Sequence, residues 1–106
     1  MLDLITGDAP NYALTAKQDG AVFNINTSLV VNAKILDKDK NELVASVTCD
    51  NSATGADWAN SLVVASFTKA QTETVTYTGK GFIELQIDTT TPLTWFYPLN
   101  IQLGTI

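Results

Sequence analysis

Alternating apolar and polar residues in two neighbouring segments, 29–37 and 42–49, flank a short run of charged and amide residues. The alternate apolar positions are Leu29, Val31, Ala33 and Ile35 in the first segment and Leu43, Ala45, Val47 and Cys49 in the second. Successive side chains of a strand point to opposite faces, so alternation on both sides of a polar turn is typical of a β-hairpin with one buried face. We therefore predict a central hairpin whose apolar face is covered by the other strands.

The rest of the chain predicts further strands and no long helix. Gly7–Pro10 separates two short alternating runs and interrupts strand pairing, which lets an edge strand pass from one sheet to another. Asp19-Gly20 predicts a tight hairpin turn, and Thr68 is a candidate N-cap for a single helical turn. With seven or eight strands over residues 1–106, we predict a single all-β domain, a two-sheet antiparallel β-sandwich with immunoglobulin-like connections.

The same alternation assigns residues to the core and to the outer face. The predicted core contains Val31, Ile35, Val47, Ile83, Leu85, Ile87 and Leu99. In the last strand, 94–103, the inner face carries Trp95, Tyr97, Leu99, Ile101 and Leu103, and the outer face carries Phe96 and Pro98. Pro98 has no backbone donor and therefore marks an edge strand or a bulge. The outer apolar residues Val30, Leu36, Val44 and Phe96 indicate either a surface covered by a partner or a second layer of a thick core.

Composition and charge exclude several classes of function. The chain contains six lysines, eleven acidic residues, no His and no Arg, and its net charge is −5. Nucleic-acid binding requires a basic surface, which six scattered lysines do not provide. The longest apolar run, Leu62–Ala65, is far shorter than the roughly 20 residues of a membrane-spanning helix, and the first residues carry no secretory signal. We expect a protein that is made in a reducing cytosol, with Cys49 as a buried, unreactive thiol.

Catalysis and metal binding find no support in the residue spacing. The Asp37–Glu42 segment places oxygen ligands at alternate positions, like the start of a calcium loop. However, Glu42 stands where that loop needs Gly and Thr48 where it needs a bidentate acid, so the segment is interpreted as a charged hairpin turn. The spacing selects no pair of carboxylates, and a nucleophile would lack a His partner. We expect no enzymatic activity, no metal and no cofactor.

Surface residues are therefore the candidates for function. Phe96 and Pro98, together with Leu103 and Ile106 in the uncharged C-terminal segment, are predicted to contact a partner. Trp58 follows the polar segment 50–57 and has two interpretations: a lid on the end of the core, or a further contact residue.

Several features of the chain occur together in a known group of domains. They are the opening Ile5–Asp8, the Asp19-Gly20 turn with the Asn24–Ser28 lead-in, the Val30–Asp37 strand with its Asp/Lys turn, the Thr68–Thr72 segment, and a strand starting at Gly81 that is followed by Thr94-Trp95. In these features the chain resembles small β-sandwich domains of tailed-bacteriophage structural proteins, in particular the N-terminal domain of upper baseplate proteins. It departs from them at the tip of the central hairpin, where Lys40-Asn41 replaces the usual Gly.

This resemblance implies a structural role in a virion, with other virion proteins as partners and many copies per particle. The protein would be made in the host cytoplasm and act as a small accessory protein on the capsid surface, as a decoration or cement protein or a fibre anchor. A baseplate or tail adaptor is a second hypothesis. A third is a carbohydrate-binding module, which requires Trp58 and Trp95 to be exposed and coplanar as stacking platforms. A fold alone does not choose among these functions.

Overall fold

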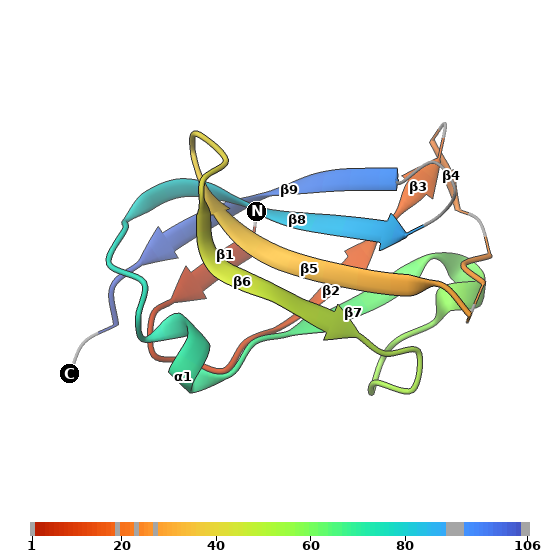
Figure 1. Ribbon diagram of the computed structural model, residues 1–106, viewed down its shortest axis with the longest axis horizontal. Coiled ribbons are helices and arrows are strands. Elements are labelled where there is room, and N and C mark those ends of the chain that lie inside the picture. Colours follow the sequence, from red (N-terminus) through yellow and green to blue (C-terminus); the bar gives the residue numbers. More distant parts are fainter. Residues whose placement is uncertain (1, 19, 23, 27, 89–92, 105–106) are drawn as a thin grey trace.

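The computed structural model describes residues 2–18, 20–22, 24–26, 28–88 and 93–104, and it is built almost entirely of strands (Figure 1). The strands are β1 (Leu2–Ile5), β2 (Asn11–Thr15), β3 (Lys17–Gln18), β4 (Ala21–Val22), β5 (Val30–Asp37), β6 (Glu42–Cys49), β7 (Leu62–Ser66), β8 (Gly79–Asp88) and β9 (Leu93–Gln102). A 3₁₀ turn, η1 (Trp58–Asn60), and a one-turn helix, α1 (Lys69–Thr72), complete the described elements. The predicted all-β class is confirmed.

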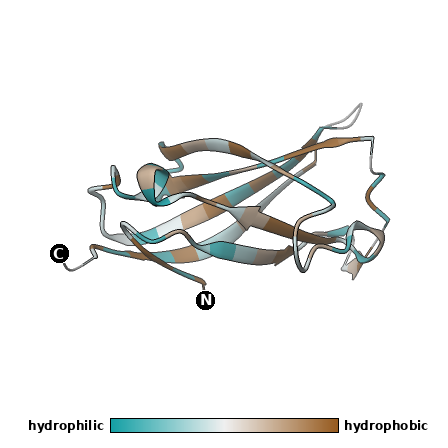
Figure 2. Ribbon diagram, turned by 90° about the horizontal axis from the view of Figure 1, so that it is seen from below, coloured by the Kyte–Doolittle hydropathy of each residue, from teal (hydrophilic) through white to brown (hydrophobic). Residues whose placement is uncertain are grey.

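Five strands form the main sheet in the order β1-β9-β8-β5-β6, while β2 pairs with β7 and β3 with β4 in two small sheets. All pairs are antiparallel except β1 and β9, which run parallel, so the prediction of wholly antiparallel sheets is wrong at this pair. The strands run lengthwise through the molecule, with apolar and polar residues alternating along them (Figure 2). Inward residues of the main sheet and of the β2–β7 pair belong to one apolar cluster, so the core lies between these two layers.

The turn between β1 and β2 carries the chain from the main sheet to the small one, as predicted from Gly7–Pro10. Gly7 has a φ of 91°, a conformation that favours glycine. The hydroxyl of Thr72, which is fully buried in α1, accepts the Gly7 N–H at 3.1 Å and donates to the Asp8 carbonyl. Thr68 caps α1 with a reciprocal capping box, which confirms the predicted N-cap and ties this helical turn to the β1–β2 turn.

The central hairpin is present, but its second strand departs from strict alternation. Between the pairs Ala33–Val47 and Ile35–Val44, β5 advances two residues while β6 advances three. Because one extra residue in a strand reverses its faces, Val44 turns inward and is 4% exposed, whereas Ala45 is exposed. The predicted faces of Val44 and Ala45 are therefore wrong, and β-bulging is the physical reason.

Most of the predicted core is confirmed. Val31, Ile35, Ile83, Leu85, Ile87 and Leu99 are buried, and Val47 is partly buried against them. The predicted end of the last strand and the predicted inward face of Leu103 are wrong, because β9 ends at Gln102 and Leu103 is 57% exposed. Pro98 is not at a bulge, because β9 keeps one continuous register with β8. The other side of β9 is paired with β1 only from Leu99 onwards, so Pro98 lies where no described strand covers that edge.

Candidate functional site

The outer face of the main sheet carries a cluster of apolar side chains at the end next to the β5–β6 turn. Leu36, Phe82 and Pro98 are register neighbours on β5, β8 and β9, and Phe96 lies one outward position away from Pro98 on β9. The Phe82 and Phe96 rings meet edge to face, with centroids 6.2 Å apart and an interplanar angle of 79°. We call Leu36, Phe82, Phe96, Pro98 and Lys40 the outer patch.

The residues of the outer patch differ in exposure. Leu36 is 2% exposed although it does not belong to the inner core, because it lies beside Phe82 on the outer side of the sheet. Of the two interpretations of Leu36, its burial agrees with a second layer of the core and not with a surface residue that a partner covers. Phe96 is 42% exposed and Pro98 is exposed, so these two side chains form the accessible part. Val30 is 48% exposed on the same face, at the opposite end of β5.

Lys40 covers the aromatic rings from the β5–β6 turn. Its Nζ lies 4.2 Å from the centroid of the Phe96 ring and 5.7 Å from that of Phe82, within the range of a cation–π interaction. Lys40 has a φ of 63°, a left-handed conformation that costs a non-glycine residue about 1 kcal/mol or more. The turn thus holds a lysine in a position that favours glycine.

Asp37 builds this turn. One of its carboxylate oxygens accepts the N–H groups of Asp39 and Asn41, each at 2.9 Å, and the other accepts the Asn41 side-chain amide at 3.4 Å. The backbone hydrogen bond from Asn41 is the main cause that lowers the pKa of this exposed carboxyl group. The segment Asp37–Glu42 therefore serves as a hydrogen-bonded hairpin turn. In the described part of the chain, no three His, Cys, Asp or Glu side chains lie together as metal ligands.

One ion pair borders the outer patch. Lys34 on β5 and Glu84 on β8 lie opposite each other, with Nζ and Oε2 3.3 Å apart. Glu84 is also the register neighbour of Phe96, so the pair separates the patch from the polar half of the face. Both side chains are only partly exposed, and a pair so close to solvent contributes little to stability, so its effect is to satisfy Lys34 and Glu84 locally.

The structure separates the predicted contact residues into three places. Phe96 and Pro98 lie together in the outer patch. Leu103 lies seven residues further along the chain from Phe96, roughly 23 Å at the rise of an extended strand. Trp58 lies in η1 and is 4% exposed, which agrees with a lid on the core and leaves almost no indole surface that a partner could contact. Ile106 lies outside the described residues.

Sequence reasoning did not identify Phe82 and Lys40 as members of a site. Phe82 could have been found, because it has the same parity as Glu84 on an evenly alternating strand and therefore faces outward. Nothing local places Lys40 over the rings, because that contact requires the turn to fold back across β8 and β9.

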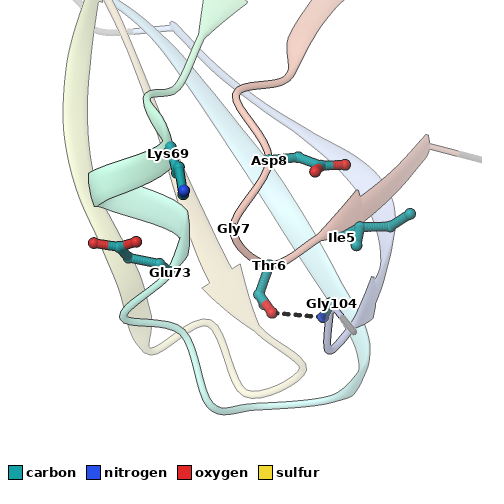
Figure 3. A pocket seen from close by; sticks show the side chains of 7 residues that line it. All are labelled: Ile5, Thr6, Gly7, Asp8, Lys69, Glu73 and Gly104. Atoms are coloured by element: carbon teal, nitrogen blue, oxygen red, sulfur yellow. Dashed lines mark hydrogen bonds between the residues drawn. The ribbon is translucent and has the colours of Figure 1, made fainter. Parts of the chain in front are cut away.

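A second candidate is an open hollow of about 570 Å³ at the end of the molecule near α1 (Figure 3). Its lining residues are Ile5, Thr6, Gly7, Asp8, Lys69, Glu73 and Gly104. Two of these lining residues are joined by a hydrogen bond, since the Gly104 N–H donates to the Thr6 hydroxyl at 2.9 Å. Asp8, Lys69 and Glu73 are exposed, and the carboxylates of Asp8 and Glu73 point in opposite directions (Figure 3). Because these charges do not converge on one point, the hollow is a weaker candidate than the outer patch.

The carbohydrate-binding hypothesis requires two exposed indoles, and the structure does not provide them. Trp58 is buried, and its Nε1 has no hydrogen-bond partner in the described structure. Trp95 is half-buried against the core, and its Nε1 donates to the Lys17 carbonyl at 2.8 Å. Tyr97 similarly donates to the Thr15 carbonyl at 2.8 Å, so both β9 side chains connect the main sheet to the chain of β2 and β3. Their role is structural.

Comparison with known proteins identifies no relative: no family model, curated protein or solved structure matches the chain. Among the described residues, no helix is long and apolar enough to cross a membrane.

Proposed function

We propose that this protein is a non-enzymatic structural protein of a tailed-phage virion, an accessory protein that binds the capsid surface through the outer patch. The observation that carries the proposal is the exposed aromatic and proline surface of Phe96 and Pro98 on an ordered sheet face. Aromatic residues on a rigid face supply large contact area with little loss of side-chain entropy. The resemblance of the chain to domains of phage structural proteins gives the biological setting.

The charge of the chain favours this role. With a net charge of −5, free subunits repel one another and stay soluble until they dock. A specific interface buries roughly 800 Å² per partner, so each subunit needs a patch of only that size to dock on a particle.

We also propose an immunoglobulin-like sandwich as the finer description of the fold. The order β9-β8-β5-β6 in one sheet and the pairing of β2 with β7 in the other correspond to the GFCC′ and BE strands of variable-type immunoglobulin domains. Modules of this kind present their sheet faces and loops to partners, which is consistent with docking through the outer face.

Co-sedimentation with particles tests the proposed function. Labelled protein is incubated with capsids and, separately, with tails from a phage that lacks the protein, and bound protein is measured after centrifugation. We expect binding to capsids and its loss in Phe96→Ser. Val30→Ser is the matched control, because Val30 is similarly exposed (48% against 42% for Phe96) on the same face outside the outer patch. Binding to tails alone would replace the capsid role with a tail adaptor, and wild-type binding by Phe96→Ser would refute the outer patch as the docking surface.

A further inference from the structure

The first half of β9 is an uncovered edge of the main sheet. β8 pairs with β9 from Leu93 to Ile101, whereas β1 pairs with the other side of β9 only from Leu99 to Gln102. Within the described chain, no strand therefore lies beside residues 93–98 on that side, since β1 begins beside the middle of β9 (Figure 1). An edge of this kind presents unpaired backbone donors and acceptors to an incoming strand.

One hydrogen bond shows which residues of β9 point to this edge. The N–H and C=O of one residue in a strand point to the same side, and successive residues alternate between the two sides. The Gln102 carbonyl accepts the Thr6 N–H at 3.0 Å, on the side of β1. The even-numbered residues of β9 therefore face the edge. Thr94 and Phe96, which are both exposed, each present one N–H and one C=O there, and the N–H that Pro98 lacks takes nothing from the β8–β9 ladder.

The first half of β9 lacks the charge and the irregularity that protect the other edges of the main sheet. The β6 edge is interrupted by its bulge and carries Glu42, and β1 is only four residues long and carries Asp3. Among the five described strands of this sheet, β9 alone has no charged residue. Because the chain has a net charge of −5, two copies avoid contact between like charges best where they meet along β9.

We infer that a second copy of this chain occupies the edge, with the two β9 strands antiparallel and centred on Trp95. Thr94 of each copy then lies opposite Phe96 of the other, and the two residues exchange four backbone hydrogen bonds across a twofold axis. The sequence has Pro92 and Pro98 three residues on either side of Trp95, so in this register the positions without an N–H fall opposite each other. This self-complementary pattern favours a second copy over an unrelated strand. The inference goes beyond the proposed function and does not use the outer patch as a docking face.

An apolar hollow beside the edge receives a side chain of the second copy. The hollow has a volume of about 280 Å³, lies between β9 and β2, and is lined by Leu2, Ala13, Leu14, Thr15, Tyr97 and Pro98. In the proposed register Leu93 of the second copy lies opposite Tyr97, and both residues belong to the inward-facing set of β9. Leu93 is therefore the side chain that fills the hollow. A contact along one short strand buries less than the roughly 800 Å² per partner of a stable interface, so the dimer dissociates with a Kd on the order of 0.1 mM.

Sedimentation equilibrium and amide hydrogen exchange test the inference on the full chain. Between about 10 μM and 1 mM, the protein should pass from monomer to dimer. Salt should strengthen the dimer, because it screens the repulsion between two copies that each carry a net charge of −5. By nuclear magnetic resonance, the Thr94 and Phe96 amides should exchange more slowly at the high concentration. The Trp95 amide points to β8 and should be protected at both concentrations.

Thr94→Pro is the informative variant, because it removes a donor that faces the edge and leaves the β8–β9 ladder intact. It deletes two of the four hydrogen bonds between the copies and should raise the Kd roughly tenfold or more. Thr94→Val keeps the N–H and is the matched control, which should dimerise like the wild type.

Three results would overturn the inference: a wild type that stays monomeric at the highest concentration, a folded Thr94→Pro with unchanged affinity, or a dimer whose Thr94 and Phe96 amides exchange as fast as in the monomer. The last result would identify another interface. Should Thr94→Pro fail to fold, amide exchange in the wild type still decides. Capsid co-sedimentation of Phe96→Ser tests the proposed function separately from all of these outcomes.

Discussion

Separate substitutions of Val44 and Ala45 are the sharpest test of the fold, because strict alternation and the observed bulge predict opposite effects on stability. Val44 is 4% exposed and faces Ile35, whereas Ala45 is exposed. Val44→Ala removes two buried carbon groups at about 0.8 kcal/mol each and leaves a small cavity, so the free energy of unfolding should fall by about 1.5–3 kcal/mol. Ala45→Thr adds a β-branched side chain on the solvent side and should change it by less than about 0.5 kcal/mol.

Urea denaturation followed by circular dichroism measures both changes, with an unchanged m-value as the sign that stability alone has moved. In thermal unfolding, a loss of 1 kcal/mol corresponds to about 5 °C for a chain of this length, so the melting temperature of Val44→Ala should fall by about 8–15 °C. If the alternation continued unbroken through β6, Ala45 would face the core. Ala45→Thr would then be destabilising by about 1–3 kcal/mol through overpacking, and Val44→Ala would be nearly neutral. That pair of results would refute the bulge.

Two further predictions concern the core and the pH dependence of stability. Leu85 is fully buried, so Leu85→Ala should lower the free energy of unfolding by about 2–5 kcal/mol, whereas Leu103→Ala, at an exposed position, should leave it within about 0.5 kcal/mol in the same urea titration. Burial raises the pKa of Tyr12 and of Tyr97 to about 12, with the charges of Asp3 and Asp8 as smaller causes at Tyr12. The folded state therefore holds these protons more tightly than the unfolded state, and this contribution to stability is present below pH 10 and is lost as the pH rises towards 12. A urea midpoint that stays constant between pH 9 and about 11.5 would contradict this expectation, and Tyr97→Phe should reduce the dependence.

The features that could be predicted from the sequence are those set within one strand or one turn. The inward faces of β5 and β8 follow from alternation alone, since no bulge interrupts their mutual register from Val30 to Asp37. The passage of the chain between sheets at Gly7–Pro10 and the N-cap at Thr68 were equally accessible, because backbone freedom and side-chain capping are local properties.

The features that could not be predicted depend on which strands lie side by side. Whether β6 bulges depends on its pairing with β5 next to the turn, and no residue among 43–46 indicates an extra position. The parallel pairing of β1 with β9 joins residues almost a hundred positions apart, so no pattern within either segment contains it. Leu103 was assigned to the inner face because alternation was extended beyond Gln102, where β9 ends.

The candidate site also combines residues that the sequence predicts with residues that it does not, and one of them adopts a backbone conformation that its residue type disfavours. Alternation identified Phe96 and Pro98 as outward residues, but their neighbours Phe82 and Lys40 come from another strand and from the turn. In that turn, Asn41 is the residue whose short polar side chain best tolerates a left-handed conformation, yet Lys40 adopts it. Natural sequences agree with their local structure except where a site demands otherwise. The result of this exception is an ammonium group placed on the Phe96 ring, and this mismatch supports the outer patch as the proposed docking surface.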